Sequence, residues 1–416
     1  MRQINFLQIL LFSLFIGLTT SCENEVPTLQ TGPWRGVLQV SDTDELPFVF
    51  QLSSDSTQVY EMEIQNGEER VVVNDIVVEG DSLLVQMPFF EGYIKGSFTE
   101  NEMKGEFIKE SLSRIVPFSA IRTDSPRFVD VEPATVDVSG NWKTTFQPGM
   151  EDEYPAKGVF QQSGNQVLGT FMTTTGDYRY LEGVVSGDSL KLSTFDGAHA
   201  FLFTAKVKDS VLDGIFYSGN HSVETFAAVK DEAFELPDSN ALTFLNPGYD
   251  RFYFDFPDAS GQRVTLDDAR FANKSVLVQI MGTWCPNCLD ETKYYTNYIK
   301  NHPESDVKWV ALAFEYAPTE ERAWNGIERL RKRLAIEYPI LLAQFGTSNK
   351  VEAQKKLPML NHVLSYPTTI YLDRNHEVVK IHTGFNGPAT GEKYVKFQQE
   401  FETTLDSLTT VRATWK

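Results

Sequence analysis

Cysteine is scarce in this sequence. The chain has 416 residues and three cysteines, Cys22, Cys285 and Cys288. A framework of structural disulfides is therefore excluded as the main source of stability. A zinc site is disfavoured as well, because no second Cys-x-x-Cys and no pair of histidines is spaced to complete four ligands. The sequence predicts neither a bound metal nor a cofactor.

Basic residues are also in short supply. The chain has 37 Lys and Arg against 57 Asp and Glu, which gives a formal net charge of −20 at pH 7. Binding to a phosphate backbone needs a basic face, so nucleic acid is excluded as a partner. The composition, 41% hydrophobic and 23% charged, is that of a globular protein. The length allows two to four domains.

Long apolar runs are missing except near the N-terminus, where Ile4–Leu18 forms one. An apolar run of this length directly after Met1-Arg2 predicts a secretory signal peptide over residues 1–21. No other run reaches the roughly 18 apolar residues that a membrane-spanning helix needs, so no further span is predicted.

Small residues follow this apolar run and lead to Cys22. The sequence Thr19-Thr20-Ser21-Cys22 resembles the lipobox of bacterial lipoproteins, although Thr19 stands where that pattern usually has Leu. The resemblance implies that Cys22 becomes a lipidated mature N-terminus and that residues 22–30 form a tether. It also implies a lipid-anchored protein in the cell envelope of a bacterium, facing the periplasm. The alternative is an ordinary signal peptide with an incidental cysteine.

Two segments, residues 31–122 and 138–230, have the pattern of short strands separated by turns. They look like copies of one unit, because four short motifs recur in the same order 105 to 109 residues apart. The motif pairs are Gly32-Pro33-Trp34 and Gly140-Asn141-Trp142, Gly80–Leu83 and Gly187–Leu190, Phe90–Gly92 and Phe195–Gly197, and Gly105–Phe107 and Gly214–Phe216. Duplication of a unit of about 100 residues predicts two tandem all-β units, each a small barrel or sandwich.

The two β units contain no evident cluster of catalytic residue types. Trp34 and Trp142 could line a ligand pocket, but packing inside the core is the favoured interpretation. Binding of a sugar, a lipid or a peptide by these units stays open.

After a second linker, residues 244–416 alternate strands with helices. A hairpin is predicted over 252–266, strands over 275–281, 307–314, 339–342, 368–373 and 378–383, and helices over 286–301, 319–336, 349–356 and from 391 onward. This alternation predicts an α/β layer fold with a mainly parallel central sheet. The predicted fold class is therefore multi-domain, with two tandem all-β units followed by an α/β domain.

Cys285 and Cys288 lie between a predicted buried strand and a predicted helix, in the sequence Gly282–Cys288. A thiol in the first turn of a helix faces free N–H groups and the positive end of the helix dipole, which favour the thiolate. Pro286 suits the first helical position. Cys288 lies one turn further on. The spacing predicts a redox-active pair in which Cys285 attacks a substrate disulfide and Cys288 then releases the reduced product.

Trp-Cys-x-x-Cys after a hydrophobic strand, with Ser365–Thr369 downstream, resembles the active site of thioredoxin-fold proteins. Within that superfamily the chain resembles the TlpA/ResA-type membrane-anchored disulfide reductases. A preceding hairpin that contains Gly261 and a closing strand, Val378–Gly384, fit the same pattern. The resemblance covers residues 244–416 and does not extend to the β units. It implies a thioredoxin-like fold for this domain.

Three residues carry over from this resemblance. Pro367 matches the family's cis-proline, whose loop lies against the two cysteines, and Tyr366 would present its backbone to the substrate. X-Pro is the bond that tolerates the cis form. Trp284 matches the tryptophan that packs beside the redox pair. These three residues are the predicted substrate-binding set.

Several acidic residues lie near the motif in sequence. Glu315 follows the second strand, near where ResA-type proteins hold an acid, and is the predicted base for deprotonating Cys288. A solvent-facing carboxylate is the alternative for Glu315. Asp290 and Glu291 are predicted to complement the helix dipole, without a catalytic role.

The predicted function is an exported, lipid-anchored thiol–disulfide oxidoreductase that reduces disulfides of exported proteins. The resemblance implies a membrane thiol electron donor of the DsbD or CcdA type. One alternative is a peroxiredoxin-like thiol peroxidase, but Gln279–Cys285 lacks the Pro-x-x-x-Thr-x-x-Cys pattern of that class. The other is a ligand-binding or assembly lipoprotein with an accessory redox domain.

Overall fold

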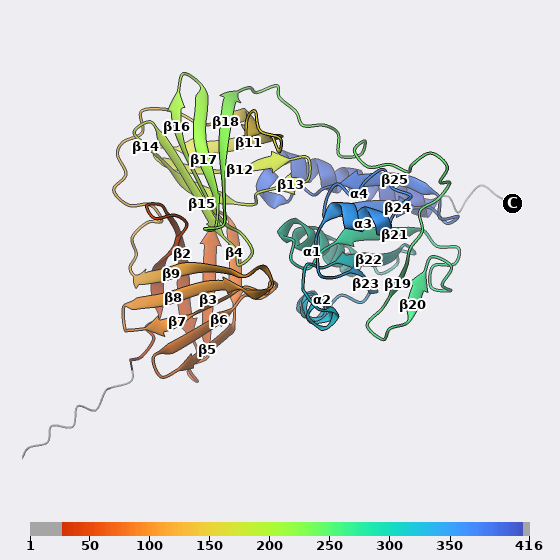
Figure 1. Ribbon diagram of the computed structural model, residues 1–416, viewed down its shortest axis with the longest axis horizontal. Coiled ribbons are helices and arrows are strands. Elements are labelled where there is room, and N and C mark those ends of the chain that lie inside the picture. The colour runs from red at the N-terminus through yellow and green to blue at the C-terminus, as the bar shows by residue number, and fades with distance from the viewer. Residues whose placement is uncertain (1–26, 411–416) are drawn as a thin grey trace, which may run out of the picture.

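The computed structural model describes residues 27–410, so the predicted signal peptide and Cys22 lie outside the described residues. Figure 1 shows two β units, drawn in red to green, beside a domain that contains the α-helices, drawn in green to blue. We name β1–β9 the first β unit, β10–β18 the second β unit, and β19–α4 the α/β domain. Within residues 27–410, none of the helices is long and apolar enough to cross a bilayer.

The first β unit is an antiparallel sheet that follows the order of the chain. Its strands are β1 (Gly32–Gln39), β2 (Glu45–Ser54), β3 (Tyr60–Asn66), β4 (Glu69–Val73), β5 (Asp75–Glu79), β6 (Ser82–Gln86), β7 (Tyr93–Phe98), β8 (Glu102–Lys109) and β9 (Arg114–Arg122), with the 3-10 helix η1 (Glu110–Leu112) before β9. Every second residue of β3 is buried, as expected for a strand with one face in a core. β1 pairs with β9, and β4 and β5 are the two ends of the sheet. The result is a barrel-like unit that is open between β4 and β5.

The second β unit closes on itself. Its strands are β10 (Gly140–Phe146), β11 (Tyr154–Ser163), β12 (Gln166–Thr173), β13 (Gly176–Asp177), β14 (Leu181–Ser186), β15 (Ser189–Phe195), β16 (Ala200–Lys208), β17 (Val211–Ser218) and β18 (Ser222–Lys230). β11 pairs with both β10 and β12, and β18 pairs with β10, so eight strands form a ring and β13 is an extra strand beside β12. A ring of this size has an interior that side chains can fill. Phe171 and Phe203 pack there with ring centroids 5.0 Å apart.

The same local structure opens both β units. Trp34 and Trp142 are each 1% exposed, so they pack in the cores. The indole N–H of Trp34 donates to the carbonyl of Gln30 at 3.1 Å, and that of Trp142 donates to the carbonyl of Val138 at 2.8 Å. In both units the acceptor is four residues before the tryptophan. This recurrence agrees with a duplication, which stays a prediction.

The α/β domain is built around a five-stranded sheet. Its elements are β19 (Asp255–Pro257), β20 (Arg263–Thr265), β21 (Val276–Met281), α1 (Pro286–Asn301), β22 (Lys308–Phe314), α2 (Glu320–Leu334), β23 (Ile340–Gln344), α3 (Lys350–Lys356), β24 (Thr368–Leu372), β25 (Val378–Thr383), the 3-10 helix η2 (Pro388–Thr390) and α4 (Glu392–Thr410). The strand order is β23-β22-β21-β24-β25.

The prediction of a mainly parallel sheet is wrong. β21, β22 and β23 are parallel, but β24 runs antiparallel to β21, and β25 runs antiparallel to β24. β24 and β25 are joined by a turn of a few residues, and strands joined by so short a turn are necessarily antiparallel. The sheet is therefore mixed.

Helices cover both faces of this sheet, which is why all six residues of β21 are buried. On one face, Val278 belongs to a core that includes Ile327 of α2. On the other face, Leu277 packs in a cluster with Tyr295 of α1 and Phe401 of α4. The central strand is thus fixed from both sides, and its C-terminal end leads into the redox motif.

The segment that joins the two β units is part of both. Arg127 lies in this segment and is buried. Its guanidinium donates to acceptors in the first unit, namely Pro47 O at 3.3 Å, Asn66 Oδ1 at 3.3 Å and Gln65 O, and in the second unit, namely Ser193 Oγ at 3.2 Å and Glu182 Oε2 at 3.3 Å. A buried charge with this many acceptors joins the two units firmly, because separating them would leave the charge unpaired.

Candidate active site

The two cysteines lie where β21 gives way to α1. Cys285 is the N-cap residue of α1 and Pro286 is its first residue. The backbone N–H of Cys288 donates to Sγ of Cys285 at 3.2 Å. Cys285 is 6% exposed and Cys288 is 0% exposed. Cys285 is therefore the thiol that a substrate can reach, and Cys288 lies behind it.

A proline loop lies against the first cysteine. The peptide bond between Tyr366 and Pro367 is cis. The thiol of Cys285 donates to the carbonyl of Tyr366 at 3.3 Å. The ring of Tyr366 packs edge-on against Trp284, with 5.6 Å between the ring centroids. The fold thus brings together Trp284, Cys285, Cys288, Tyr366 and Pro367, while their roles in substrate binding and catalysis stay predictions.

The surroundings of Cys288 favour the protonated form of its thiol. Burial raises the pKa of Cys288 well above its ordinary value, and the hydrogen bond with Cys285 adds to this effect. The thiolate of Cys288 therefore forms only when a base removes the proton. Such a base would have to reach the same buried region.

Glu315 is a buried carboxyl beside the motif. It is 3% exposed, so the alternative of a solvent-facing carboxylate is wrong. It accepts hydrogen bonds from the backbone N–H of Thr283 at 2.8 Å and from the Thr283 hydroxyl at 2.7 Å. Burial raises the pKa of Glu315 to about 7. Glu315 thus holds the loop that precedes the two cysteines.

Glu291 is a second buried carboxyl, and its predicted role as a first-turn acid that complements the helix dipole is wrong, because the first turn of α1 contains no acidic residue. It is 0% exposed and accepts hydrogen bonds from Gln279 at 2.8 Å and Thr369 at 3.0 Å. Burial raises the pKa of Glu291 to about 7. Its charge also contributes to the raised pKa of Cys288. The signal in the sequence was Gln279, because a glutamine in an apolar buried strand needs a polar partner.

A basic residue from another element also lies near the thiols. Lys350 is the first residue of α3. Partial burial lowers the pKa of Lys350, and the charge of Cys285 opposes this effect. No pattern in the sequence predicts that α3 approaches the motif. Within residues 27–410, no three His, Cys, Asp or Glu side chains are arranged to hold a metal ion.

The second β unit covers one side of the redox motif. We name residues 173–177, which include β13, the docking loop. Ser365, which precedes the proline loop, donates through its hydroxyl to the carbonyl of Thr175 at 2.8 Å. Gly384 lies so close to this loop that a Cβ there would be 2.8 Å from the carbonyl carbon of Thr175. The two backbones can approach this closely only because residue 384 is glycine.

Two further contacts fix the docking loop. A Cβ on Gly176 would overlap the side-chain amide of Asn287, the residue that lies between Pro286 and Cys288. The carboxylate of Asp177 accepts the backbone N–H of Gly387 at 2.5 Å. The loop therefore contacts the Cys-x-x-Cys motif itself and the segment that follows β25.

A buried arginine lies behind the docking loop and joins all three parts of the chain. Arg179 forms ion pairs with Asp196 of the second β unit and Asp290 of α1, each at 3.1 Å, and with Glu69 of the first β unit. Although burial opposes it, the surrounding carboxylates raise the pKa of Arg179 above its ordinary value. The predicted role of Asp290, complementing the helix dipole, is wrong as well, because Asp290 lies beyond the first turn of α1; its carboxylate pairs with Arg179 in this junction. The sequence gives no local sign of this contact.

These features define the class of site. A Cys-x-x-Cys pair at the start of a helix, a cis-proline loop against its first cysteine, and a sheet of this strand order form the dithiol site of a thioredoxin-like fold. Comparison with known proteins agrees with this description, since residues 235–395 match the Redoxin family.

Several known proteins are similar to this chain. Thioredoxin-like protein YneN of Bacillus subtilis is 27% identical over 131 residues, which cover 32% of this chain and 68% of YneN. Thiol-disulfide oxidoreductase ResA of Halalkalibacterium halodurans is 26% identical over 132 residues, which cover 32% of this chain and 65% of ResA. The solved thiol-disulfide oxidoreductase from Bacteroides fragilis is 18% identical, with a TM-score of 0.27. The match covers 36% of this chain and 99% of the solved chain.

The chain thus spans about two thirds of the length of the relatives that it matches. Its C-terminal part matches the Redoxin family and is similar to ResA-type thiol–disulfide oxidoreductases. The Redoxin match begins after the second β unit ends.

Proposed function

We propose that this chain is an exported, lipid-anchored thiol–disulfide oxidoreductase that reduces protein disulfides by dithiol exchange at Cys285 and Cys288. One observation carries the proposal. Sγ of Cys285 lies at the start of α1, where it accepts a hydrogen bond from the backbone N–H of Cys288 and donates one to the carbonyl of Tyr366. Cys288 is buried behind it. A thiol in this position favours attack, and a second thiol behind it favours resolution.

The exchange transfers two electrons. The Cys285 thiolate attacks one sulfur of the substrate disulfide, a mixed disulfide forms, and the first substrate thiol leaves. Cys288 then attacks Sγ of Cys285, and the second substrate thiol leaves. The substrate ends reduced and the pair ends as a Cys285–Cys288 disulfide. Trp284, Tyr366 and Pro367 would contact the incoming disulfide, because they border Cys285.

The second step needs a base for Cys288, and two buried carboxyls are candidates. The pKa values of Glu315 and Glu291 are both raised to about 7 by burial, which suits a proton acceptor near neutral pH. Glu315 is the candidate that the family resemblance favours, and Glu291 is the one whose charge acts on Cys288.

Substitution separates these two candidates. The variant of the acting base, Glu315→Gln or Glu291→Gln, should slow resolution of a preformed mixed disulfide at Cys285 by about a hundredfold. The other variant should have a much smaller effect. Glu352→Gln is a matched control, because Glu352 is exposed and pairs with Lys355 on the surface of α3. If neither buried variant slows resolution, neither residue is the base.

The location is proposed from residues outside the described part of the chain. The run Ile4–Leu18 followed by Cys22 supports export, cleavage before Cys22 and lipid anchoring in a bacterial envelope, facing the periplasm. A reductase outside the cytoplasm needs imported electrons, which supports a membrane thiol donor of the DsbD or CcdA type. Labelling with a fatty-acid analogue tests the anchor. Cys22→Ser should abolish labelling, and labelling that persists would refute the anchor.

Two measurements test the function as a whole. The Cys285–Cys288 potential should lie near that of thioredoxin, about −270 mV, if the protein is a reductase. A value near about −120 mV would instead indicate an oxidant. In parallel, the chain should reduce insulin disulfides and should not consume peroxide at a comparable rate. Cys288→Ala should trap exported proteins as mixed disulfides at Cys285.

A further inference from the structure

A cavity borders the redox motif on the side of Trp284 and Pro286. Its volume is about 250 Å³. All three parts of the chain contribute to its wall, since β8 and β9, the ends of β16 and β17, and the redox motif line it. This volume suits one side chain or a small molecule rather than a folded domain. Any group bound here lies beside Cys285, because both neighbours of Cys285 in the chain line the cavity.

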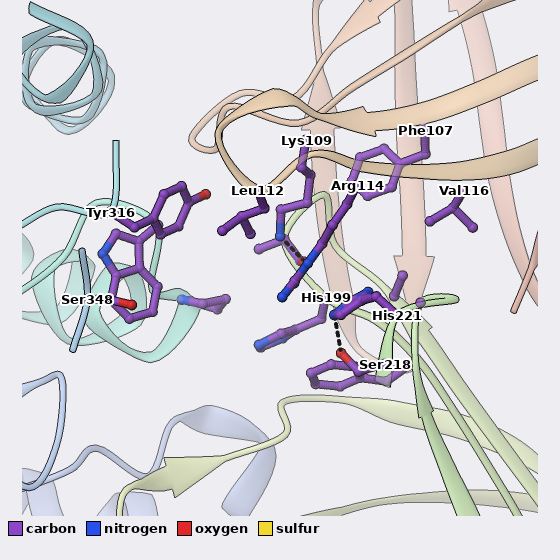
Figure 2. Close-up of a pocket in the computed structure, with 16 residues that line it drawn as sticks. Phe107, Lys109, Leu112, Arg114, Val116, His199, Ser218, His221, Tyr316 and Ser348 are labelled. Carbon is purple, nitrogen blue, oxygen red and sulfur yellow. Dashed lines mark hydrogen bonds between the residues drawn. The ribbon is translucent and has the colours of Figure 1, made fainter. Parts of the chain in front are cut away.

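The wall of this cavity is basic. In Figure 2, Lys109, Arg114, His199 and His221 extend into the space from the β units, and Tyr316 lies on the opposite side. Of the described residues, sixteen line the cavity, and none of them is Asp or Glu. The chain as a whole has 57 acidic residues against 37 basic ones. We name this cavity the cationic pocket, because its charge is opposite to that of the molecule.

Among the described residues, neither Lys109 nor Arg114 forms an ion pair, and the acidic groups that act on Lys109, Asp196 and Glu91, are not part of the pocket wall. Within the described part of the chain, the guanidinium of Arg114 forms no hydrogen bond and no ion pair. Among the described residues, the acceptor of Lys109 is the carbonyl of Ala198, at 2.9 Å. Burial and the charge of Arg114 lower the pKa of Lys109 to about 8, while the charges of Asp196 and Glu91 oppose this effect, so Lys109 is still mostly charged at pH 7. Two cations that share a partly buried cavity without an anion are unfavourable.

The histidines add donors rather than charge. Partial burial, together with the charges of Arg114 and Lys109, lowers the pKa of His221 to about 4, so His221 is neutral at pH 7. His199 lies 3.2 Å from the carboxylate of Asp196, so any charge on its ring already has a partner. The free positive charge in the pocket therefore comes from Lys109 and Arg114.

The opposite side of the motif is closed. The docking loop packs against Asn287, Ser365 and Gly384, which leaves little room for a substrate there. Trp284 and Pro286 lie on the side away from the docking loop, so a disulfide that approaches Cys285 past these two residues passes the wall of the cationic pocket. A charged group next to the substrate sulfur would then lie within reach of Arg114.

We propose that the cationic pocket binds a carboxylate carried by the disulfide substrate, so that the preferred substrates of the redox pair are acidic disulfides. The shared chemistry is a carboxylate within a few bonds or residues of the disulfide. It has two possible sources, an acidic segment of a protein and a small disulfide that bears carboxylates. The inference rests on the proposed function, because it concerns the substrate of the same two cysteines.

Single-turnover kinetics of the full chain test the preference. The pre-reduced pair supplies both electrons, so no further donor is needed. Two disulfide-linked peptides that differ only by Glu or Gln beside the cysteine are compared. The Glu peptide should react about tenfold faster, and this ratio should fall with added salt. Equal rates, or a slower Glu peptide, would overturn the inference.

A neutral disulfide separates this failure from failure of the proposed function. Hydroxyethyl disulfide carries no charge and needs only the thiols. If it and both peptides leave the pair reduced, the proposed function fails. If all three react and the two peptides react equally, the function stands and only the inference fails.

Substitution assigns the preference to the pocket. Arg114→Gln should bring the ratio between the Glu and Gln peptides close to one, and Arg114→Lys should keep part of it. Arg122→Gln is the matched control, because Arg122 lies at the other end of β9 and is exposed. A ratio that survives in Arg114→Gln, or that is lost equally in Arg122→Gln, would contradict the assignment.

Oxidised glutathione distinguishes the two sources of the carboxylate. An acceleration that depends on Arg114 for glutathione alone assigns the pocket to small acidic disulfides. The same dependence for the Glu peptide alone assigns it to acidic protein segments. Absence of the dependence for both would overturn the inference.

Discussion

The two sides of Cys285 differ in what the β units place against them. On the side of Asn287 and Gly384, the docking loop packs backbone against backbone and leaves little space. On the side of Trp284 and Pro286, the cationic pocket separates the β units from the redox motif. This difference teaches that the β units are more than a spacer. They close one approach to the thiol and shape the other, so the direction of access is a property of the whole chain.

The largest effect is expected when Cys285, which lies between the docking loop and the cationic pocket, is replaced. Cys285→Ser should lower disulfide exchange at least about a thousandfold, because a serine hydroxyl is a far weaker nucleophile than a thiolate. Cys288→Ala should instead keep the first step and accumulate mixed disulfide. Single-turnover reaction with a peptide disulfide measures both. Exchange that continues through Cys288 in the Cys285→Ser variant would contradict the assigned order.

The second largest effect is expected when the ion pairs of Arg179 behind the docking loop are removed. Arg179→Gln should destabilise the chain by about 3–5 kcal/mol, because three carboxylates would then be buried without their cation. Denaturant unfolding of the full chain measures this change. Arg331→Gln is the control, since Arg331 is exposed and pairs with Glu328 on α2, and it should change stability by less than about 1 kcal/mol. Equal effects of the two variants would show that the buried junction carries no special weight.

A third prediction concerns pH and the two carboxyls behind the pair. Burial raises the pKa values of Glu291 and Glu315 from 4.5 to about 7. Between these values the folded chain keeps protons that the unfolded chain has lost, so the contribution of these two groups to stability is fully present below pH 4.5 and is lost as pH rises through about 7. Each group contributes at most about 3 kcal/mol to this fall.

Denaturant unfolding at pH 5 and pH 8 measures that slope. Glu291→Gln and Glu315→Gln should each flatten it, because glutamine does not titrate. An unchanged slope in both variants would mean that neither carboxyl has a raised pKa.

The smallest effect is expected at the contact between Gly384 and the docking loop. Gly384→Ala should cost about 1–3 kcal/mol, because the new Cβ meets the backbone of Thr175 and the residue has a φ of 77°. Gly346→Ala is a matched control, since Gly346 also has a positive φ, 85°, but nothing lies within 4 Å of its Cβ position. Hydrogen exchange of the docking loop should rise in Gly384→Ala only. Equal costs without faster exchange would indicate backbone strain alone.

Local signals in the sequence predicted much of the α/β domain. The start of α1 follows from Pro286 and from the cap at Cys285, which act within one turn. The antiparallel direction of β24 was missed, because the sequence does not show in which direction the chain enters the sheet again after α3. Glu291 was missed because an acid in the third position after Cys288 looks the same whether its helix face is exposed or buried.

The junctions between the parts could not be predicted, for a physical reason. Arg179, Thr175 and Gly384 meet across long stretches of chain, and no short-range pattern records which surfaces pack together. The cationic pocket is similar, since Lys109 and Arg114 gain their setting only when the second β unit and the redox motif close around them.

Arg127 has a consequence for how such chains can arise and change. Its guanidinium needs carbonyl acceptors such as Pro47 O in the first β unit and the hydroxyl of Ser193 in the second. A chain that lost the first unit would keep this cation without its acceptors on Pro47, Gln65 and Asn66, at a cost of several kcal/mol. The two units are therefore expected to be inherited and lost as a pair, and a descendant with a single unit would carry a different residue in place of Arg127.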